Sequence, residues 1–134
     1  ELYLDQIEQK LPELKPSRGP YKPRFLADKF IQGLAPDTDN RLRYRMKTFK
    51  TFEPGEVDPK EAVDRLINNF ERLNKIIIQC EGKDMRSFKV TTALGPVLRF
   101  YVGDALRFVT AHNARHFVQL EDILSNVKHP KLPS

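Results

Sequence analysis

Two histidines near the end of the sequence are the residues whose types and spacing are best suited to chemistry. His112 and His116 are four residues apart, in a run whose apolar spacing predicts one long amphipathic helix. Residues four apart on a helix lie on the same side, one turn above the other, so two imidazoles placed there can bind one divalent metal ion. The alternative is a pair of core histidines whose ring nitrogens are satisfied by hydrogen bonds within the protein.

The number of available ligands limits the metal interpretation. Both histidines follow the apolar side of the predicted helix, so we expect both to point into the interior. A catalytic zinc site usually has three protein ligands and a position for water. His129 lies beside Pro130 at a helix end expected to fray, and Asp104 is two turns before His112, too far along the axis to share the ion. The sequence therefore offers two ligands and no obvious third.

Four segments are predicted to form the helices that position this pair. They are residues 2–14, 23–34, 58–81 and 102–128. The clearest start is at Asp58, which can cap a helix that continues with Pro59 and has the capping-box acid at Glu61. Residues 83–101 are interpreted as a connector, because their β-branched and aromatic run is too short to imply a sheet. The sequence therefore predicts an all-α helical bundle in a single domain, residues 1–134.

Composition restricts the class of protein and its surroundings. The chain has 134 residues, of which 31% are charged and 40% hydrophobic, as in a domain with one core. No apolar run approaches the roughly 20 residues that cross a bilayer, and no signal peptide is visible. Cys80 is the single cysteine, which predicts a cytoplasmic protein without an internal disulfide. Its place on an apolar stripe favours a buried structural thiol over a nucleophile.

The net charge of +5 is concentrated in one run. Five positive charges lie between Arg41 and Lys50, with no acid among them. They could form a solvated edge along a link, or bind an anionic ligand or nucleic acid beside Tyr44 and Phe49. Because acids and bases are interspersed over most of the chain, we do not expect nucleic acid as a partner.

The last predicted helix resembles the final helix of DinB-like proteins, the superfamily that includes YfiT-type metal-dependent hydrolases and several thiol transferases. The family pattern is a histidine, three residues including an arginine, a second histidine and a glutamine three residues later. His112, Arg115, His116 and Gln119 match all four elements. Arg115 itself is interpreted as facing away from the histidines, in a salt bridge on the helix surface.

The resemblance implies a DinB/YfiT-like four-helix bundle whose N-terminal part is missing from this chain. In that family three histidines hold a nickel or zinc ion. His112 and His116 would be two of them, and Gln119 would orient one ring by a hydrogen bond to its second nitrogen. The third ligand would come from the helix that ends in residues 2–14, so it is expected upstream of Glu1.

The function implied is that of a divalent-metal-dependent enzyme, either a hydrolase or a thiol S-transferase. The ion would lower the pKa of a bound water or thiol and so supply a nucleophile. The partners would be a small-molecule substrate or a low-molecular-weight thiol, with no membrane, and a second copy in a homodimer, since an incomplete bundle would also expose an apolar groove. No catalytic acid or base stands out. The alternative is a non-catalytic helical-bundle module for binding or dimerisation, with an incomplete metal site.

Overall fold

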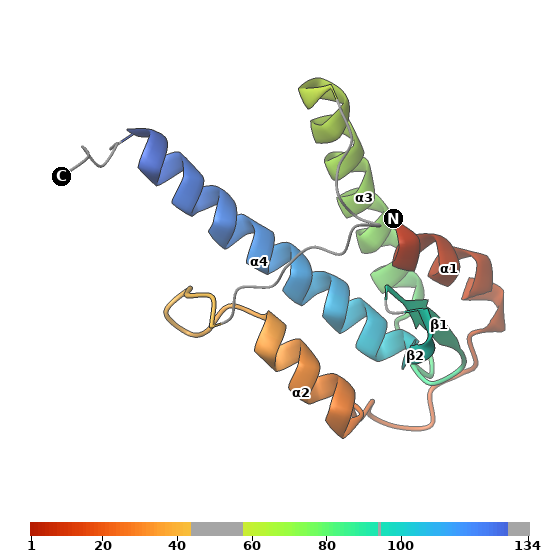
Figure 1. Cartoon of the computed structure of the whole chain (residues 1–134). Coiled ribbons are helices and arrows are strands. Elements are labelled where there is room, and N and C mark those ends of the chain that lie inside the picture. Colours follow the sequence, from red (N-terminus) through yellow and green to blue (C-terminus); the bar gives the residue numbers. More distant parts are fainter. Residues whose placement is uncertain (44–57, 94, 129–134) are drawn as a thin grey trace.

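The computed structural model describes residues 1–43, 58–93 and 95–128. The elements in chain order are α1 (Leu2–Lys10), a 3-10 turn (Leu11–Glu13), α2 (Phe25–Leu34), α3 (Pro59–Gln79), β1 (Lys89–Thr92), β2 (Gly95–Tyr101) and α4 (Val102–Lys128). Figure 1 shows α4 as the long central element. The strands and α1 gather near its start, α2 lies beside it, and the first half of α3 diverges from its far end.

The fold is mixed rather than all-α, so the predicted four-helix bundle is wrong. β1 and β2 form a two-stranded antiparallel sheet in which Val90 pairs with Phe100. Gly95 begins β2 with φ of 78°, a left-handed conformation that glycine adopts at little cost. The interpretation of residues 83–101 as a connector fails because this short hairpin gains its stability from packing. Val90 and Phe100 are both buried against the helices.

The predicted helices are confirmed, with shorter bounds for the first three, since α3 spans Pro59–Gln79 instead of residues 58–81. α1 ends at Lys10 instead of residue 14, and α2 begins at Phe25 instead of residue 23. At the start of α3, Asp58 Oδ1 accepts hydrogen bonds from the backbone N–H of Lys60 (2.7 Å) and of Glu61 (3.3 Å), as the capping signal predicts. α4 begins at Val102, directly after β2.

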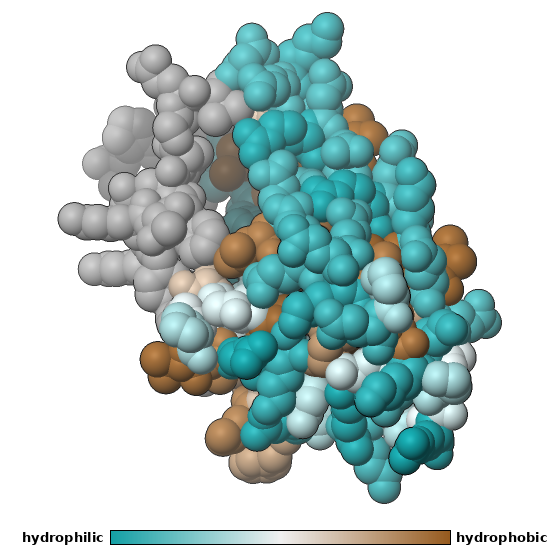
Figure 2. Space-filling model, turned by 90° about the vertical axis from the view of Figure 1, so that its right-hand side faces the viewer, coloured by the Kyte–Doolittle hydropathy of each residue, from teal (hydrophilic) through white to brown (hydrophobic). Residues whose placement is uncertain are grey.

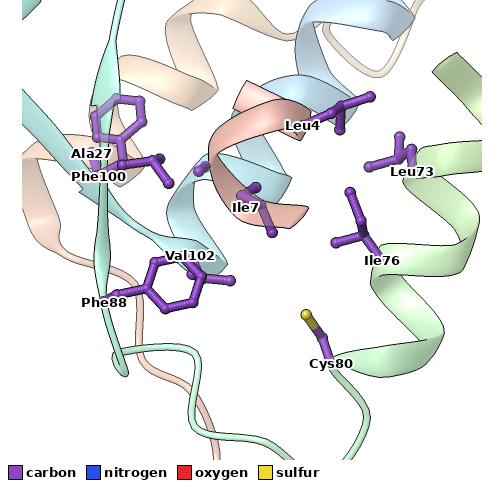
Figure 3. Close-up of a cluster of buried hydrophobic side chains, with 11 residues drawn as sticks. Leu4, Ile7, Ala27, Leu73, Ile76, Cys80, Phe88, Phe100 and Val102 are labelled. Carbon is purple, nitrogen blue, oxygen red and sulfur yellow. The ribbon is translucent and has the colours of Figure 1, made fainter. Parts of the chain in front are cut away.

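The main core joins α1, the second half of α3, the hairpin and the start of α4, with Ala27 from α2 (Figure 3). Its buried side chains are Leu4, Ile7, Ala27, Leu73, Ile76, Cys80, Phe88, Val90, Phe100, Val102 and Ala105. The predicted burial of Cys80 is confirmed. A smaller cluster of Ile31, Leu34 and Ala111 fixes α2 against α4. The buried residues that α4 contributes to the two clusters all precede the histidine pair.

Polar interactions reinforce the contacts between helices. Arg72 on α3 donates hydrogen bonds to Glu8 (2.7 Å) and to Asp5 (2.5 Å) on α1. Arg107 on α4 forms an ion pair with Asp28 on α2. Figure 2 shows that polar side chains cover most of one face, with separate hydrophobic areas among them. None of the helices in the described ranges is long and apolar enough to cross a membrane.

Candidate metal-binding site on α4

The two histidines of the sequence motif meet on α4. Nε2 of His112 and Nε2 of His116 are 2.8 Å apart, and the two rings lie edge to face with centroids separated by 4.4 Å. One turn of helix therefore brings these two ring nitrogens within hydrogen-bond distance of each other, as the spacing of four predicts.

Gln119 fixes the orientation of His116. Its Oε1 lies 2.9 Å from Nδ1 of that ring, which is the hydrogen bond expected for this residue. An amide oxygen can only accept, so Nδ1 of His116 carries the proton and donates it. In the neutral ring the lone pair then lies on Nε2, on the side of His112. Ligating histidines usually have this arrangement, with the second ring nitrogen held by an acceptor.

The two rings differ in exposure. His112 is half-buried and stacks on Phe108, with ring centroids 5.7 Å apart. His116 is exposed, so the prediction that both histidines point into the interior is wrong for it. The apolar side of α4 at this level also carries Phe117 and Leu120, and both are exposed. The pair therefore lies at the boundary between the packed part of α4 and its exposed end.

Electrostatics keep His112 neutral. Burial, with smaller contributions from His116 and from the charge on Arg115, lowers the pKa of His112 to about 4. Its Nδ1 is buried and has no hydrogen-bond partner in the part of the chain that the structure describes. A neutral imidazole is the form that binds a metal ion, so His112 is available as a ligand at neutral pH without losing a proton.

The donor set fits a divalent ion only in part. Two nitrogens about 2.1 Å from one ion lie about 3.0–3.4 Å apart, so the observed 2.8 Å needs only a small opening of the pair. The described ranges contain no group of three His, Cys, Asp or Glu side chains that could hold a metal. Asp5 and Glu8 on α1 form ion pairs with Arg72 on α3. His129 lies outside the described residues.

Arg115 differs from its predicted place. It is only 5% exposed, and its Nη1 donates a hydrogen bond to the carbonyl oxygen of Leu34 at 3.4 Å. The interpretation of Arg115 as a surface residue is therefore wrong, because α2 packs over that side of α4. Arg115 links the end of α2 to the turn that carries both histidines.

A groove lies on the opposite side of α4, and no pattern in the sequence predicted it. It has a volume of about 760 Å³, and its mainly apolar walls come from α2, α3 and α4. Helical steps of about 100° place its residues Thr110 and Ala114 across the helix from His112, and neither histidine lines it. The only trace of this packing in the sequence is the glycine at position 103. In the structure a Cβ at Gly103 would lie 2.6 Å from the Tyr21 ring.

Buried polar atoms lie behind this groove. Asp104 is fully buried in the first turn of α4, and its Oδ1 lies 3.5 Å from Nη1 of Arg107. Burial, together with the neighbouring Asp104 carboxylate, raises the pKa of Tyr21. The Tyr21 hydroxyl has no hydrogen-bond partner among the described residues. These groups are closed off from solvent, so the accessible wall of the groove is apolar.

Comparisons with protein-family models, with curated proteins and with solved structures find no match to this chain. The case for a function therefore depends on the geometry of His112, His116 and Gln119.

Proposed function

We propose that this chain provides part of the metal site of a divalent-metal-dependent enzyme of the DinB-like superfamily, acting as a hydrolase or thiol S-transferase. The observation that carries the proposal is the approach of Nε2 of His112 to Nε2 of His116 at 2.8 Å. Because the fold differs from the expected bundle, the support for the family comes from the motif on α4 alone. Imidazole nitrogens suit nickel and zinc, which are the ions we expect.

Each residue of the motif has a separate task. His112 and His116 would hold the ion, and Gln119 keeps the proton of His116 on the nitrogen that faces away from it. Phe108 stacks on His112 and restricts rotation of that ring. When bound, the ion would lower the pKa of a water or thiol and so supply a nucleophile. The exposure of His116 leaves one side of the pair open to a small-molecule substrate.

The third ligand must come from outside the described residues. Two imidazoles alone bind an ion more weakly than a complete three-residue site. We therefore expect measurable binding by this chain, and tighter binding once the remaining ligand is supplied.

Metal titration tests the proposal. Zinc or nickel should bind the protein in calorimetry and raise the midpoint of thermal unfolding, since a ligand that binds only the folded state stabilises it. The variants His112→Ala and His116→Ala should each abolish both effects. Thr110→Ala changes an exposed residue on the opposite side of α4 and is the matched control, in which both effects should persist.

Two results would contradict the proposal. One is an unfolding midpoint that zinc and nickel leave unchanged in the unaltered protein. The other is unchanged metal stoichiometry in the His112→Ala and His116→Ala variants.

A further inference from the structure

Two segments that are distant in the sequence carry an excess of positive charge, and the fold brings them together. Residues 10–24 and 81–101 contain nine basic and three acidic residues, an excess larger than the net charge of +5 of the whole chain. The backbone N–H of Ser17 donates to the carbonyl oxygen of Gly82 at 2.9 Å, so the first segment runs along the second, past the hairpin (Figure 1). The expectation of no nucleic-acid partner rested on charges interspersed along the sequence, whereas the folded chain gathers these cations at one end.

The outer side of the hairpin presents cations around one aromatic ring. Side chains alternate between the two sides of a strand, and Phe100 points into the core, so Arg99 and Tyr101 point outwards. Lys89 pairs with Tyr101 across the two strands, and its Nζ lies 4.9 Å from the centroid of the Tyr101 ring. The guanidinium carbon of Arg24, at the end of the first segment, lies 5.7 Å from the same centroid. We call Arg24, Lys89, Arg99 and Tyr101 the hairpin face.

The cations of the hairpin face form no ion pair with an acid in the described ranges. The basic residues that do form ion pairs there lie elsewhere, and they are Arg65, Arg72 and Arg107. Arg24 and Arg99 are exposed, and Lys89 is partly exposed. A polyanion on this face would therefore meet three accessible cations without having to displace a described acidic side chain.

The aromatic ring among these cations indicates which kind of polyanion fits. Proteins that bind single-stranded nucleic acid combine cations, which contact phosphates, with aromatic rings on which bases stack. Tyr101 is partly exposed, and its ring lies against two cations. It thus offers a face for stacking rather than an apolar side chain that projects into a bilayer. A duplex keeps its bases inside the stack, so it would use the cations and not the ring.

We propose that the hairpin face binds single-stranded nucleic acid, with a base stacked on Tyr101 and phosphates against Arg24, Lys89 and Arg99. Every base has a face that can stack, so we expect little preference for sequence. Each cation that contacts a phosphate releases a counterion, so the affinity should fall steeply as salt is added. None of these residues is a proposed metal ligand, so this inference goes beyond the proposed metal function and does not depend on it.

Fluorescence anisotropy of a labelled oligothymidine tests the proposal on the whole chain. A length of about 12 nucleotides suits the roughly 4–16 nucleotides that single-strand sites cover. With three phosphate contacts, the affinity should fall about twentyfold between roughly 50 and 200 mM salt. The duplex of this strand with oligodeoxyadenosine should bind more weakly, because its bases cannot reach Tyr101.

Variants separate stacking from charge. Tyr101→Ala should weaken binding about tenfold with an unchanged salt dependence, whereas Tyr101→Phe keeps the ring and should bind like the unaltered protein. Lys89→Gln and Arg99→Gln should each weaken binding and reduce the logarithmic salt slope by about 0.7. Lys60→Gln also removes one positive charge, from the exposed start of α3 that points away from the hairpin (Figure 1), and should bind like the unaltered protein.

Several results would overturn the proposal. Absence of binding to oligothymidine at about 50 mM salt is one, since affinity is highest there. Equal losses in Lys60→Gln and Lys89→Gln would indicate attraction to net charge alone. Unchanged binding by Tyr101→Ala, or a duplex that binds as tightly as the single strand, would remove the role of the ring. Binding to phosphatidylserine vesicles without binding to oligothymidine would assign the face to a membrane, with Phe25, which is 72% exposed beside Arg24, as its apolar anchor.

Discussion

The two halves of α3 share one apolar pattern and differ in what covers it. In the second half, Ile76 is 1% exposed and packs in the main core with α1 and the hairpin. On the apolar side of the helix, Leu73 in the second half is 7% exposed and lies in the same core, whereas Leu66, seven residues earlier on the same side, is 49% exposed. Apolar spacing therefore identifies the side of a helix that prefers burial, while a neighbouring element decides whether burial occurs.

Along α4 the apolar side chains likewise change from buried to exposed, and the histidine pair lies at this transition. Val102 and Ala105 are completely buried near the start of α4, whereas Leu120 and Ile123 are exposed near its end. His112 stacks on Phe108 on the packed side of this boundary, and His116 lies beyond it. The His112 ring is thus held by packing, while the His116 ring is accessible to solvent. A site that binds an ion and a substrate needs both properties.

The largest expected effect compares the halves of α3 directly. Ile76→Ala should lower the free energy of unfolding by about 2–4 kcal/mol, because it leaves a cavity in the main core. Ile67→Ala removes the same atoms from an exposed site, and should cost less than about 1 kcal/mol in dilute solution. Urea unfolding of both variants measures the difference. Equal losses would mean that the first half of α3 is covered as fully as the second.

A second pair compares polar contacts at the same two levels of α3. Arg72 bridges to Glu8 and Asp5 with its side chain 22% exposed, whereas Arg65 bridges to Glu1 with its side chain 51% exposed. Water screens the exposed pair more strongly. Arg72→Met should therefore cost about 1–2 kcal/mol in urea unfolding, and Arg65→Met should cost clearly less. A larger cost for Arg65→Met would show that α1 is held mainly through Glu1, the residue before its first turn.

Local signals in the sequence predicted the helices well. Asp58, Pro59 and Glu61 fix the start of α3 through contacts within one turn, so no distant residue is needed to recognise it. The spacing of His112, His116 and Gln119 likewise depends on helix geometry alone, and the structure brings all three together.

Features that depend on distant neighbours could not be predicted. The hairpin has one strand of only four residues, and its stability comes from packing on helices far away in the sequence. Arg115 is buried because α2 covers it, and His116 is exposed because none of the described elements covers that end of α4. Periodicity places Arg115 and His116 on sides of a helix, but it contains no information on which element packs against each side.

Gln119 provides a smaller test of the pair itself. Gln119→Ala removes the acceptor that holds Nδ1 of His116, and should weaken zinc binding about tenfold in calorimetry. Gln119→Glu keeps an acceptor at this position and should retain the affinity. Gln32→Ala removes another exposed glutamine hydrogen bond, to Asp28, and should leave zinc binding unchanged. If all three variants bind zinc equally, the orientation of His116 does not matter for the metal.

The smallest expected effect is the pH dependence caused by His112. Its pKa is lowered from 6.5 to about 4 in the folded protein, so the unfolded chain binds a proton there at a higher pH than the folded protein does. The contribution of neutral His112 to stability is therefore complete above pH 6.5 and is lost as the pH falls towards 4. The ring is only half-buried, which reduces the loss to about 1 kcal/mol. Urea unfolding at several pH values should show that the difference in free energy of unfolding between the unaltered protein and His112→Gln changes as the pH falls from 6.5 towards 4, because only the unaltered protein loses the contribution of neutral His112. The carboxylates titrate in both proteins and cancel in that difference, so a difference independent of pH would place His112 on the solvent side of the boundary, with His116.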